Sequence, residues 1–225
     1  MSRFEELFTQ HVATAFARQL ALADRIGERD WQLDLTEGVV TFGEDLRYPV
    51  QLLGTESDGS GSHGSWLWAW ANTGSNLPVH LLHLSEWLRG YGEQAGVAEL
   101  TEASFPLERA DGARLALIAS GLTGRCYYRG PYDGGAVFFH LEGLPASLIE
   151  PVSPERAFLV LGQVIQAFPV DHRAMLLAFL GQQGWSIGED GPGLVVGHHP
   201  GGSEMRVEFD EQGRIGRVSG QVQPG

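Results

Sequence analysis

The chain contains no lysine, and arginine supplies all fifteen of its basic side chains. Schiff-base catalysis, attachment of pyridoxal phosphate and the phosphate-binding loops of kinases and P-loop enzymes all use a lysine amine. The sequence therefore excludes these mechanisms for this chain. Asparagine is also scarce, occurring only at Asn72 and Asn76, and this bias is typical of a GC-rich bacterial genome.

Cysteine occurs once, at Cys126, so neither an internal disulfide nor a multi-cysteine metal site can form. Long apolar runs are absent too, since none approaches the roughly 18 to 20 residues that a membrane-spanning helix needs. The first six residues carry acids where a signal peptide would place a basic patch and an apolar stretch. We therefore expect a soluble cytoplasmic protein without a metal or another cofactor.

Acidic side chains outnumber basic ones by 28 to 15, which gives a net charge of −13 and a pI near 4.9. Such a surface repels phosphate backbones, and the arginines are scattered rather than clustered, so nucleic-acid binding is disfavoured. A basic protein is the partner that this charge favours. Hydrophobic residues make up 43% of the chain, enough for a substantial core.

The first two thirds of the chain alternate between helical and strand periodicities. Apolar residues recur at helical spacing over residues 3–27, and a period of two follows at residues 31–35. We expect further strands at residues 39–42, 47–55 and 66–71, joined by short turns as an antiparallel meander. The remaining elements expected before residue 145 are helices at 76–94 and 113–122 and strands at 126–129 and 136–141.

The segment 142–152 contains two prolines and is the best candidate for a boundary. Beyond it, capping residues predict helices that begin near Ser153 and Asp171, and four short strands separated by turn residues follow them. The fold class is therefore α+β: a mainly antiparallel sheet flanked by helices in residues 1–148, and a smaller helix–helix–meander unit in residues 149–225. We expect the two to pack as one unit.

Trp66, Trp68 and Trp70 alternate with small apolar residues and are the most distinctive feature of the chain. A period of two places all three indoles on one face of a strand and the small residues on the other. Because neither face is polar, we expect a central strand covered on both sides, with a helix close to the small face. The indoles form part of the core in one interpretation and an aromatic wall for a flat or apolar ligand in the other.

Residues 59–64 match the glycine pattern of dinucleotide-binding loops, but a strand follows them where that fingerprint requires a helix. A kinase glycine loop would need the missing lysine. We expect a hairpin loop.

Histidines give the next candidates. His80 and His83 lie three residues apart on the helix expected at 76–94, a spacing that could hold a metal, although packed or half-exposed histidines are the simpler interpretation. Cys126 and His140 fall on one expected hairpin and could form a nucleophile–base pair, but no local feature lowers the pKa of the thiol.

Tyr128, Arg129 and Asp133 lie around the turn of the same hairpin, together with Tyr127 and Tyr132. Hydrogen-bonding groups gathered at a tight turn are typical of ligand sites. The alternative is a turn that its own tyrosines and aspartate stabilise.

Several sequence phrases together resemble an uncharacterised bacterial family, domain of unknown function DUF6882. These are DWQLDL at residues 30–35, VQLLG at 50–54 and WLWAWAN at 66–72, of which the last is the most specific. The resemblance continues in residues 115–124, 162–184 and 207–214, which implies that both halves belong to one unit. It implies no activity, ligand or functional residue.

Three functions remain open. The leading hypothesis is a non-catalytic module that binds a protein or a small apolar ligand, because no catalytic motif is complete. The alternatives are a hydrolase-like enzyme whose His, Asp or Glu residues come from distant segments, and a structural or oligomer-forming protein. The candidate binding residues are Trp66, Trp68, Trp70, His80, His83, Tyr128, Arg129 and Asp133. A cavity of about 300 Å³ or more beside the indoles would favour a ligand.

Overall fold

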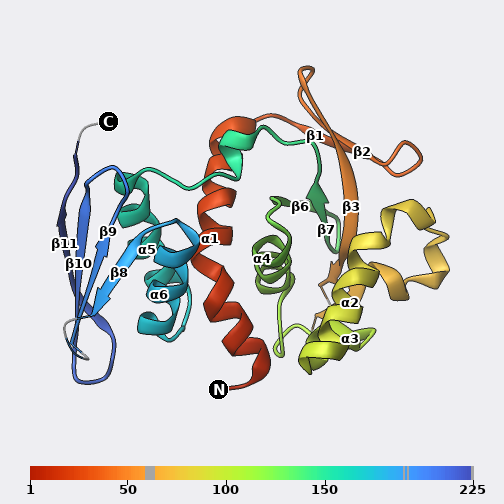
Figure 1. The fold of residues 1–225 in the computed structure, drawn as a ribbon. Helices are drawn as coiled ribbons and strands as arrows, with labels where there is room; N and C mark the ends of the chain where they lie inside the picture. Colours follow the sequence, from red (N-terminus) through yellow and green to blue (C-terminus); the bar gives the residue numbers. More distant parts are fainter. Residues whose placement is uncertain (59–63, 190, 192, 224–225) are drawn as a thin grey trace. The chain divides into compact units, whose positions relative to one another are not determined.

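The structure, a computed structural model, describes residues 1–58, 64–189, 191 and 193–223. It divides into two compact units, drawn in Figure 1. Unit 1 comprises Met1–Phe4 and Arg18–Ile149, and unit 2 comprises Glu5–Ala17 and Glu150–Gly225. Helices and antiparallel sheets occur in both, which confirms the α+β class. The glycine loop expected at residues 59–64 lies outside the described residues except for Gly64.

Helix α1 (Arg3–Ile26) confirms the first helix expected from the sequence, and it ends where Gly27 adopts a φ of +56°. A left-handed residue at this position is the usual end of a helix, and glycine adopts it without steric penalty. Residues of α1 contribute to both units. No helix among the described residues is long and apolar enough to cross a membrane.

Unit 1 is built on a seven-stranded antiparallel sheet whose longest strand is β3 (Leu46–Ser57). The first residues of β3 pair with β2 (Val39–Phe42), its last residues pair with β4 (Ser65–Trp68), and β7 (Gly135–Leu141) pairs along its second half. Three outer strands complete the sheet: β1 (Trp31–Asp34) beside β2, β5 (Ser104–Pro106) beside β4, and β6 (Tyr127–Tyr132) beside β7. The meander expected from β1 to β4 is confirmed.

One face of this sheet packs against helix α4 (Gly112–Thr123), and we call it the α4 face. A Cβ atom on Gly112 would lie 2.6 Å from the ring of Trp66 and 2.7 Å from that of Phe138, so only glycine lets the helix approach this closely. The buried carboxylate of Glu56 accepts a hydrogen bond from the Gly112 amide at 2.7 Å. This bond satisfies an amide at the positive end of the helix.

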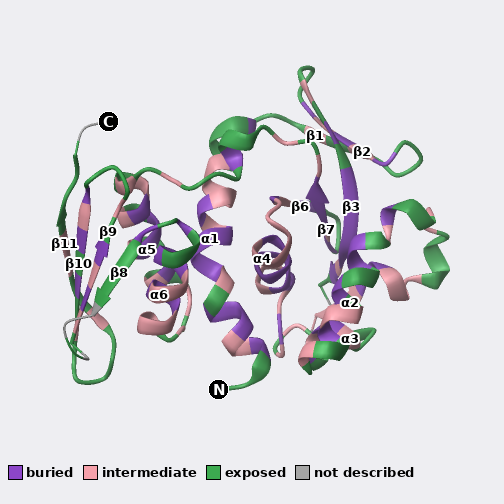
Figure 2. Cartoon of the chain, viewed as in Figure 1, coloured by how far each residue is buried: buried purple, intermediate pink, exposed green. Residues whose placement is uncertain are grey.

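The opposite face carries a second apolar cluster. Leu22 and Ile26 of α1 pack there with Phe42 of β2 and with Leu52 and Phe139 of the central strands. The strand register is irregular between Leu52 and Gly54, so Leu52 and Thr55 both belong to this face although they are three residues apart. Figure 2 shows β3 buried along most of its length.

Two segments between β4 and α4 differ from the sequence-based expectation. The helix expected at 76–94 begins only at His83, as α2 (His83–Ala95), and the residues before it form short 3-10 turns. Asn76 ends one of these turns with a φ of +45°, which a continuous helix does not permit. Helix α3 (Ala98–Thr101) and strand β5 lie between the helices expected at 76–94 and 113–122, where the sequence predicts no further element.

Unit 2 contains helices α5 (Pro154–Ala167) and α6 (His172–Gln182) and a four-stranded antiparallel sheet. Ser153 and Asp171 cap the two helices as predicted. The predicted meander is confirmed, in the order β11 (Ile215–Gln221), β10 (Glu204–Phe209), β9 (Leu194–His198) and β8 (Ser186–Glu189).

The core of unit 2 includes part of the first helix. The ring of Phe168 contacts the rings of Phe8 and Phe16, with centroid distances of 5.3 and 6.3 Å. Gln182 donates a hydrogen bond to the carbonyl of Gln10 at 2.9 Å. Nothing in the periodicity of α1 indicates that its first half belongs with residues 150–225.

Candidate binding site

Trp66 and Trp68 are fully buried on the α4 face of the sheet. Their rings meet edge to face, with centroids 5.3 Å apart, and Trp66 also contacts Phe138 at 5.5 Å. The indole N–H of Trp68 donates to the carbonyl of Glu99 at 2.9 Å. Gly54 makes room for Trp66, because a Cβ atom there would lie 2.5 Å from its ring. These two indoles are packed among protein atoms, which is the core interpretation of the motif.

Trp70 does not share their face, and the prediction of one strand through residues 66–71 is wrong. Strand β4 ends at Trp68, and Ala69–Ala71 form a 3-10 turn closed by a bond from the Asn72 amide to the Ala69 carbonyl. The chain leaves the sheet at this turn, so the alternation of side chains stops. Trp70 is half-buried, and the guanidinium of Arg89 lies 4.6 Å above its ring.

The two histidines do not lie on one helix, so that expectation is wrong as well. His80 is exposed in a 3-10 turn, where its carbonyl accepts a bond from the side chain of Gln51 at 2.9 Å. His83 is the exposed first residue of α2. No group of three or more His, Cys, Asp or Glu among the described residues could hold a metal ion.

The tyrosine-rich hairpin distributes its side chains over both faces of the sheet. Tyr128 packs on the face opposite α4, against Phe42 at 4.9 Å and Trp31 at 5.6 Å, and burial raises its pKa. Arg129 lies 3.5 Å from the Glu56 carboxylate. Asp133 is exposed at the turn. The structure therefore does not gather Tyr128, Arg129 and Asp133 around one cavity.

Cys126 and His140 also lie on opposite faces. His140 pairs with Tyr127 across the hairpin, whereas Leu141 bonds to Cys126, so the two side chains alternate. Burial raises the pKa of the Cys126 thiol to about 11. Burial, together with the smaller effect of the nearby Arg125 charge, lowers the pKa of the His140 imidazole to about 3. The two residues cannot act as a nucleophile and its base.

The main candidate site, which we call the apolar pocket, is a concavity of about 360 Å³ on the face opposite α4. It lies on the other side of strand β4 from the buried indoles, because Leu67 and Ala69 form part of its wall. A helix does pack on this face of the sheet, because Leu22 and Ile26 of α1 share an apolar cluster with Ala69; the pocket shares Leu52 and Ala69 with that cluster. Strands β1, β3, β6 and β7 and the turns after β4 supply the rest of the wall: Leu33, Leu35, Leu52, Gly54, Thr55, Asn72, Ser75, Leu77, Tyr132 and Val137.

The walls of the apolar pocket are held in place by the fold. Thr55 pairs with Leu67 on one side and with Val137 on the other, so three neighbouring strands form its floor. Leu35 follows β1 in a turn that the Asp34 carboxylate fixes by accepting the amides of Thr36 and Glu37 at 2.8 and 2.9 Å. Leu35 is 39% exposed. An exposed leucine above a preformed apolar floor is typical of a ligand site.

A second concavity in unit 1, of about 440 Å³, contains one predicted residue, His83. Trp87 lies beside it, half-exposed and stacked on Tyr91. Three polar side chains of this concavity are already paired: Arg125 contacts Glu142 at 2.6 Å, and the Gln51 amide binds both the His80 carbonyl and the Leu84 amide. A ligand here would have to replace these contacts.

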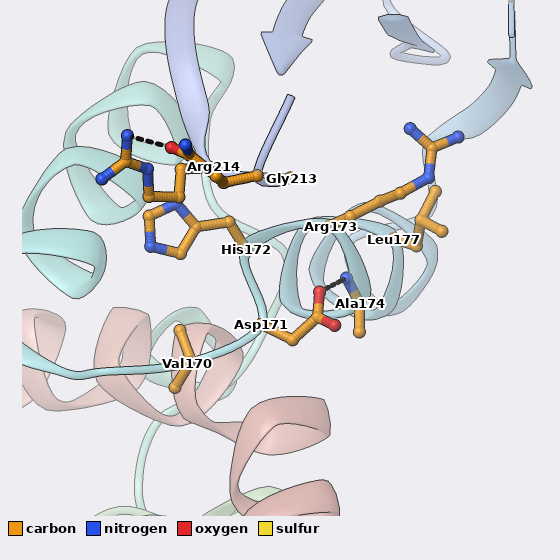
Figure 3. Close-up of a pocket in the computed structure, with 9 residues that line it drawn as sticks. Val170, Asp171, His172, Arg173, Ala174, Leu177, Gly213 and Arg214 are labelled. Atoms are coloured by element: carbon orange, nitrogen blue, oxygen red, sulfur yellow. Dashed lines mark hydrogen bonds between the residues drawn. The ribbon is translucent and has the colours of Figure 1, made fainter. Parts of the chain in front are cut away.

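Unit 2 has a concavity of about 420 Å³ between the start of α6 and the turn at residues 212–214 (Figure 3). The guanidinium groups of Arg173 and Arg214 point away from one another in this view. Arg214 pairs with Asp210 at 2.8 Å, and the His172 ring accepts the amide of Ile215 at 3.0 Å. These contacts stabilise the turn and leave no converging pair of cations for an anion.

No sequence-based expectation identified the apolar pocket, although one signal for it was present. The alternation at residues 66–69 assigns Leu67 and Ala69 to the face opposite the indoles, and those two residues are part of the wall. None of the predicted site residues lines the apolar pocket, and His83 lines the second concavity of unit 1. The contributions of Leu33 and Val137, from strands distant in sequence, carry no local signal.

Among the comparisons with known proteins, a match to one family model identifies relatives of the chain. Neither a curated protein nor a solved structure matches the chain. A family model described as a family of unknown function matches residues 5–144, a range that contains every residue of the apolar pocket. The match ends before residues 162–184 and 207–214, where the resemblance was expected to continue. Because it covers more than half of the chain, the protein belongs to the DUF6882 family.

Proposed function

We propose that unit 1 is a non-catalytic binding module and that the apolar pocket is where it holds a small apolar ligand. The observation that carries this proposal is the concavity itself, which has a volume of about 360 Å³ and a wall rich in leucine. Pockets of this size and lining are characteristic of small-molecule sites.

The chemistry of the wall supports binding rather than catalysis. Among the described residues that line the apolar pocket there is no carboxylate, imidazole or thiol, the groups that most often act as general bases and nucleophiles. The buried Cys126 thiol and His140 imidazole lie elsewhere in the sheet, with pKa values of about 11 and about 3. Near neutral pH the thiol is therefore protonated and not nucleophilic, and an imidazole with so low a pKa is too weak a base to take its proton.

Isothermal titration with octan-1-ol tests the proposal. If each of the nine non-hydrogen atoms of octan-1-ol contributes roughly 0.5 kcal/mol of binding free energy, the dissociation constant should be on the order of 0.1 to 1 mM. A Leu67→Trp variant places a larger side chain in the pocket and should weaken binding at least tenfold. Leu159→Trp, at an exposed leucine of α5 in unit 2, is the matched control and should bind as the natural chain does. Absence of binding, or equal binding by Leu67→Trp, would refute the proposal.

A further inference from the structure

The described residues that line the apolar pocket include no charged side chain, although charged residues are common in the chain. Charged residues make up 19% of the sequence, so about two would be expected among twelve lining residues chosen at random. The twelve described residues of the wall include none. Eight are apolar or glycine, and the four polar ones, Thr55, Asn72, Ser75 and Tyr132, are neutral. This composition determines which head group a ligand can carry.

Arginines of the surrounding strands are committed to other partners. Arg129 pairs with Glu56, whose side chain belongs to the α4 face. Arg47 lies 3.6 Å from Glu37 in an exposed pair at the β2–β3 end of the sheet. A ligand carboxylate in the apolar pocket would therefore be desolvated without a cation to pair with, inside a protein of net charge −13. A carboxylate is unfavourable on both counts.

The neutral polar groups of the wall can still bind one uncharged head group. The Tyr132 hydroxyl donates a hydrogen bond to the Glu56 carbonyl at 3.2 Å, so its oxygen can accept a hydrogen bond from a ligand. Thr55, Asn72 and Ser75 contribute hydroxyl and amide groups to the same wall. A hydroxyl or a primary amide matches this set, because both donate and accept hydrogen bonds.

We infer that the apolar pocket takes an uncharged aliphatic molecule with a single alcohol or amide head and discriminates against carboxylates. Its volume corresponds to about a dozen water-sized groups, which sets the upper size of the ligand. The inference rests on the proposed function and adds the chemical class of the ligand to it. Thr55, Asn72, Ser75 and Tyr132 are the residues that bind the head group.

The test compares probes of equal chain length: octan-1-ol, octanamide, octanoate and octylammonium, each titrated calorimetrically into the full chain at pH 7.5. We expect octan-1-ol and octanamide to bind at least tenfold more tightly than octanoate. If octanoate or octylammonium binds as tightly as octan-1-ol, the inference is overturned and the proposed function stands. If none of the four probes binds, the proposed function fails, and this inference fails with it.

A substitution at the rim tests whether the missing charge determines this selectivity. Leu35 is 39% exposed, so Leu35→Arg should fold and should place a cation at the mouth of the pocket. We expect the ratio of octanoate to octan-1-ol affinity to rise at least tenfold in this variant. Leu35→Gln, which is polar but neutral, is the control and should keep the original preference. An unchanged ratio in a folded Leu35→Arg variant would overturn the inference.

Discussion

A buried neutral histidine should make this protein sensitive to acid. His140 is completely inaccessible to solvent, and its Nδ1 atom lies 3.4 Å from the Thr123 hydroxyl. Burial, followed by the charge of Arg125, lowers the pKa of its imidazole to about 3 in the folded state. In the unfolded chain the imidazole has a pKa near 6.5. Replacing His140 with glutamine removes this titration and retains a polar side chain.

The magnitude follows from the difference between the two states. Because the folded-state pKa is depressed, the unfolded chain binds the proton first as the pH falls below about 6.5. The contribution of His140 to stability is complete above that pH and is lost progressively towards pH 3. Between pH 8 and pH 5 the loss is about 2 kcal/mol, since 1.5 pH units at about 1.4 kcal/mol each separate pH 5 from the unfolded pKa. This figure is insensitive to the folded-state pKa as long as that pKa lies below about 4.

Urea denaturation at pH 8, 7, 6 and 5, followed by tryptophan fluorescence, measures this loss. Five of the six tryptophans belong to unit 1, so the signal reports mainly on the unit that contains His140. The difference in free energy of unfolding between the natural chain and His140→Gln should shrink by about 2 kcal/mol from pH 8 to pH 5. His80→Gln, at an exposed position, controls for the loss of an imidazole. A difference that stays constant with pH would refute the reasoning.

Three further predictions concern packing, reactivity and capping. Gly54→Ala should lower the free energy of unfolding by about 1 to 3 kcal/mol in urea titrations, because its Cβ would lie 2.5 Å from the Trp66 ring. Gly90→Ala is the control and should be neutral or stabilising, since the space around Gly90 is open. Equal effects of the two substitutions would contradict the packing argument. Burial raises the pKa of the Cys126 thiol to about 11. At pH 8 a disulfide reagent should therefore label the folded protein at least 100-fold more slowly than the urea-unfolded chain. Rapid labelling of the folded protein would contradict this expectation. Asp171→Ala removes the cap that accepts the Ala174 amide at 2.9 Å and should destabilise unit 2 by about 1 kcal/mol, measured by amide hydrogen exchange in α6; unchanged exchange would show that the cap is dispensable.

Local signals predicted the elements that local interactions determine. Helix α1 follows a regular apolar period up to Gly27, and the C-terminal strands are separated by glycine-rich turns that fix their number and order. The segment after β4 was predicted poorly because its residues retain a strand-like alternation through Ala71. A 3-10 turn at Ala69 and the positive φ of Asn76 redirect the chain, and tertiary contacts determine both.

The candidate site was harder to predict than the fold, for a related reason. Leu33, Leu67 and Val137 come from three strands, and only the pairing of Thr55 with both neighbours brings the last two together. The irregularity between Leu52 and Gly54 adds a further difficulty, because it changes which residues of β3 share a face. A prediction from strict alternation would place Leu52 and Thr55 on opposite faces.

Strand β4 has two different roles on its two faces, and this determines how mutations in it should be interpreted. The indoles of Trp66 and Trp68 are buried against α4, where truncation to alanine typically costs about 3 to 5 kcal/mol. Loss of binding in such a variant would reflect unfolding, because the indoles do not line the apolar pocket. Leu67 lies between them in sequence but is half-buried on the opposite face, so a substitution there changes the pocket while the tryptophan core stays packed. Binding measured in folded Leu67 variants is therefore the observation that separates a ligand site from a stability defect.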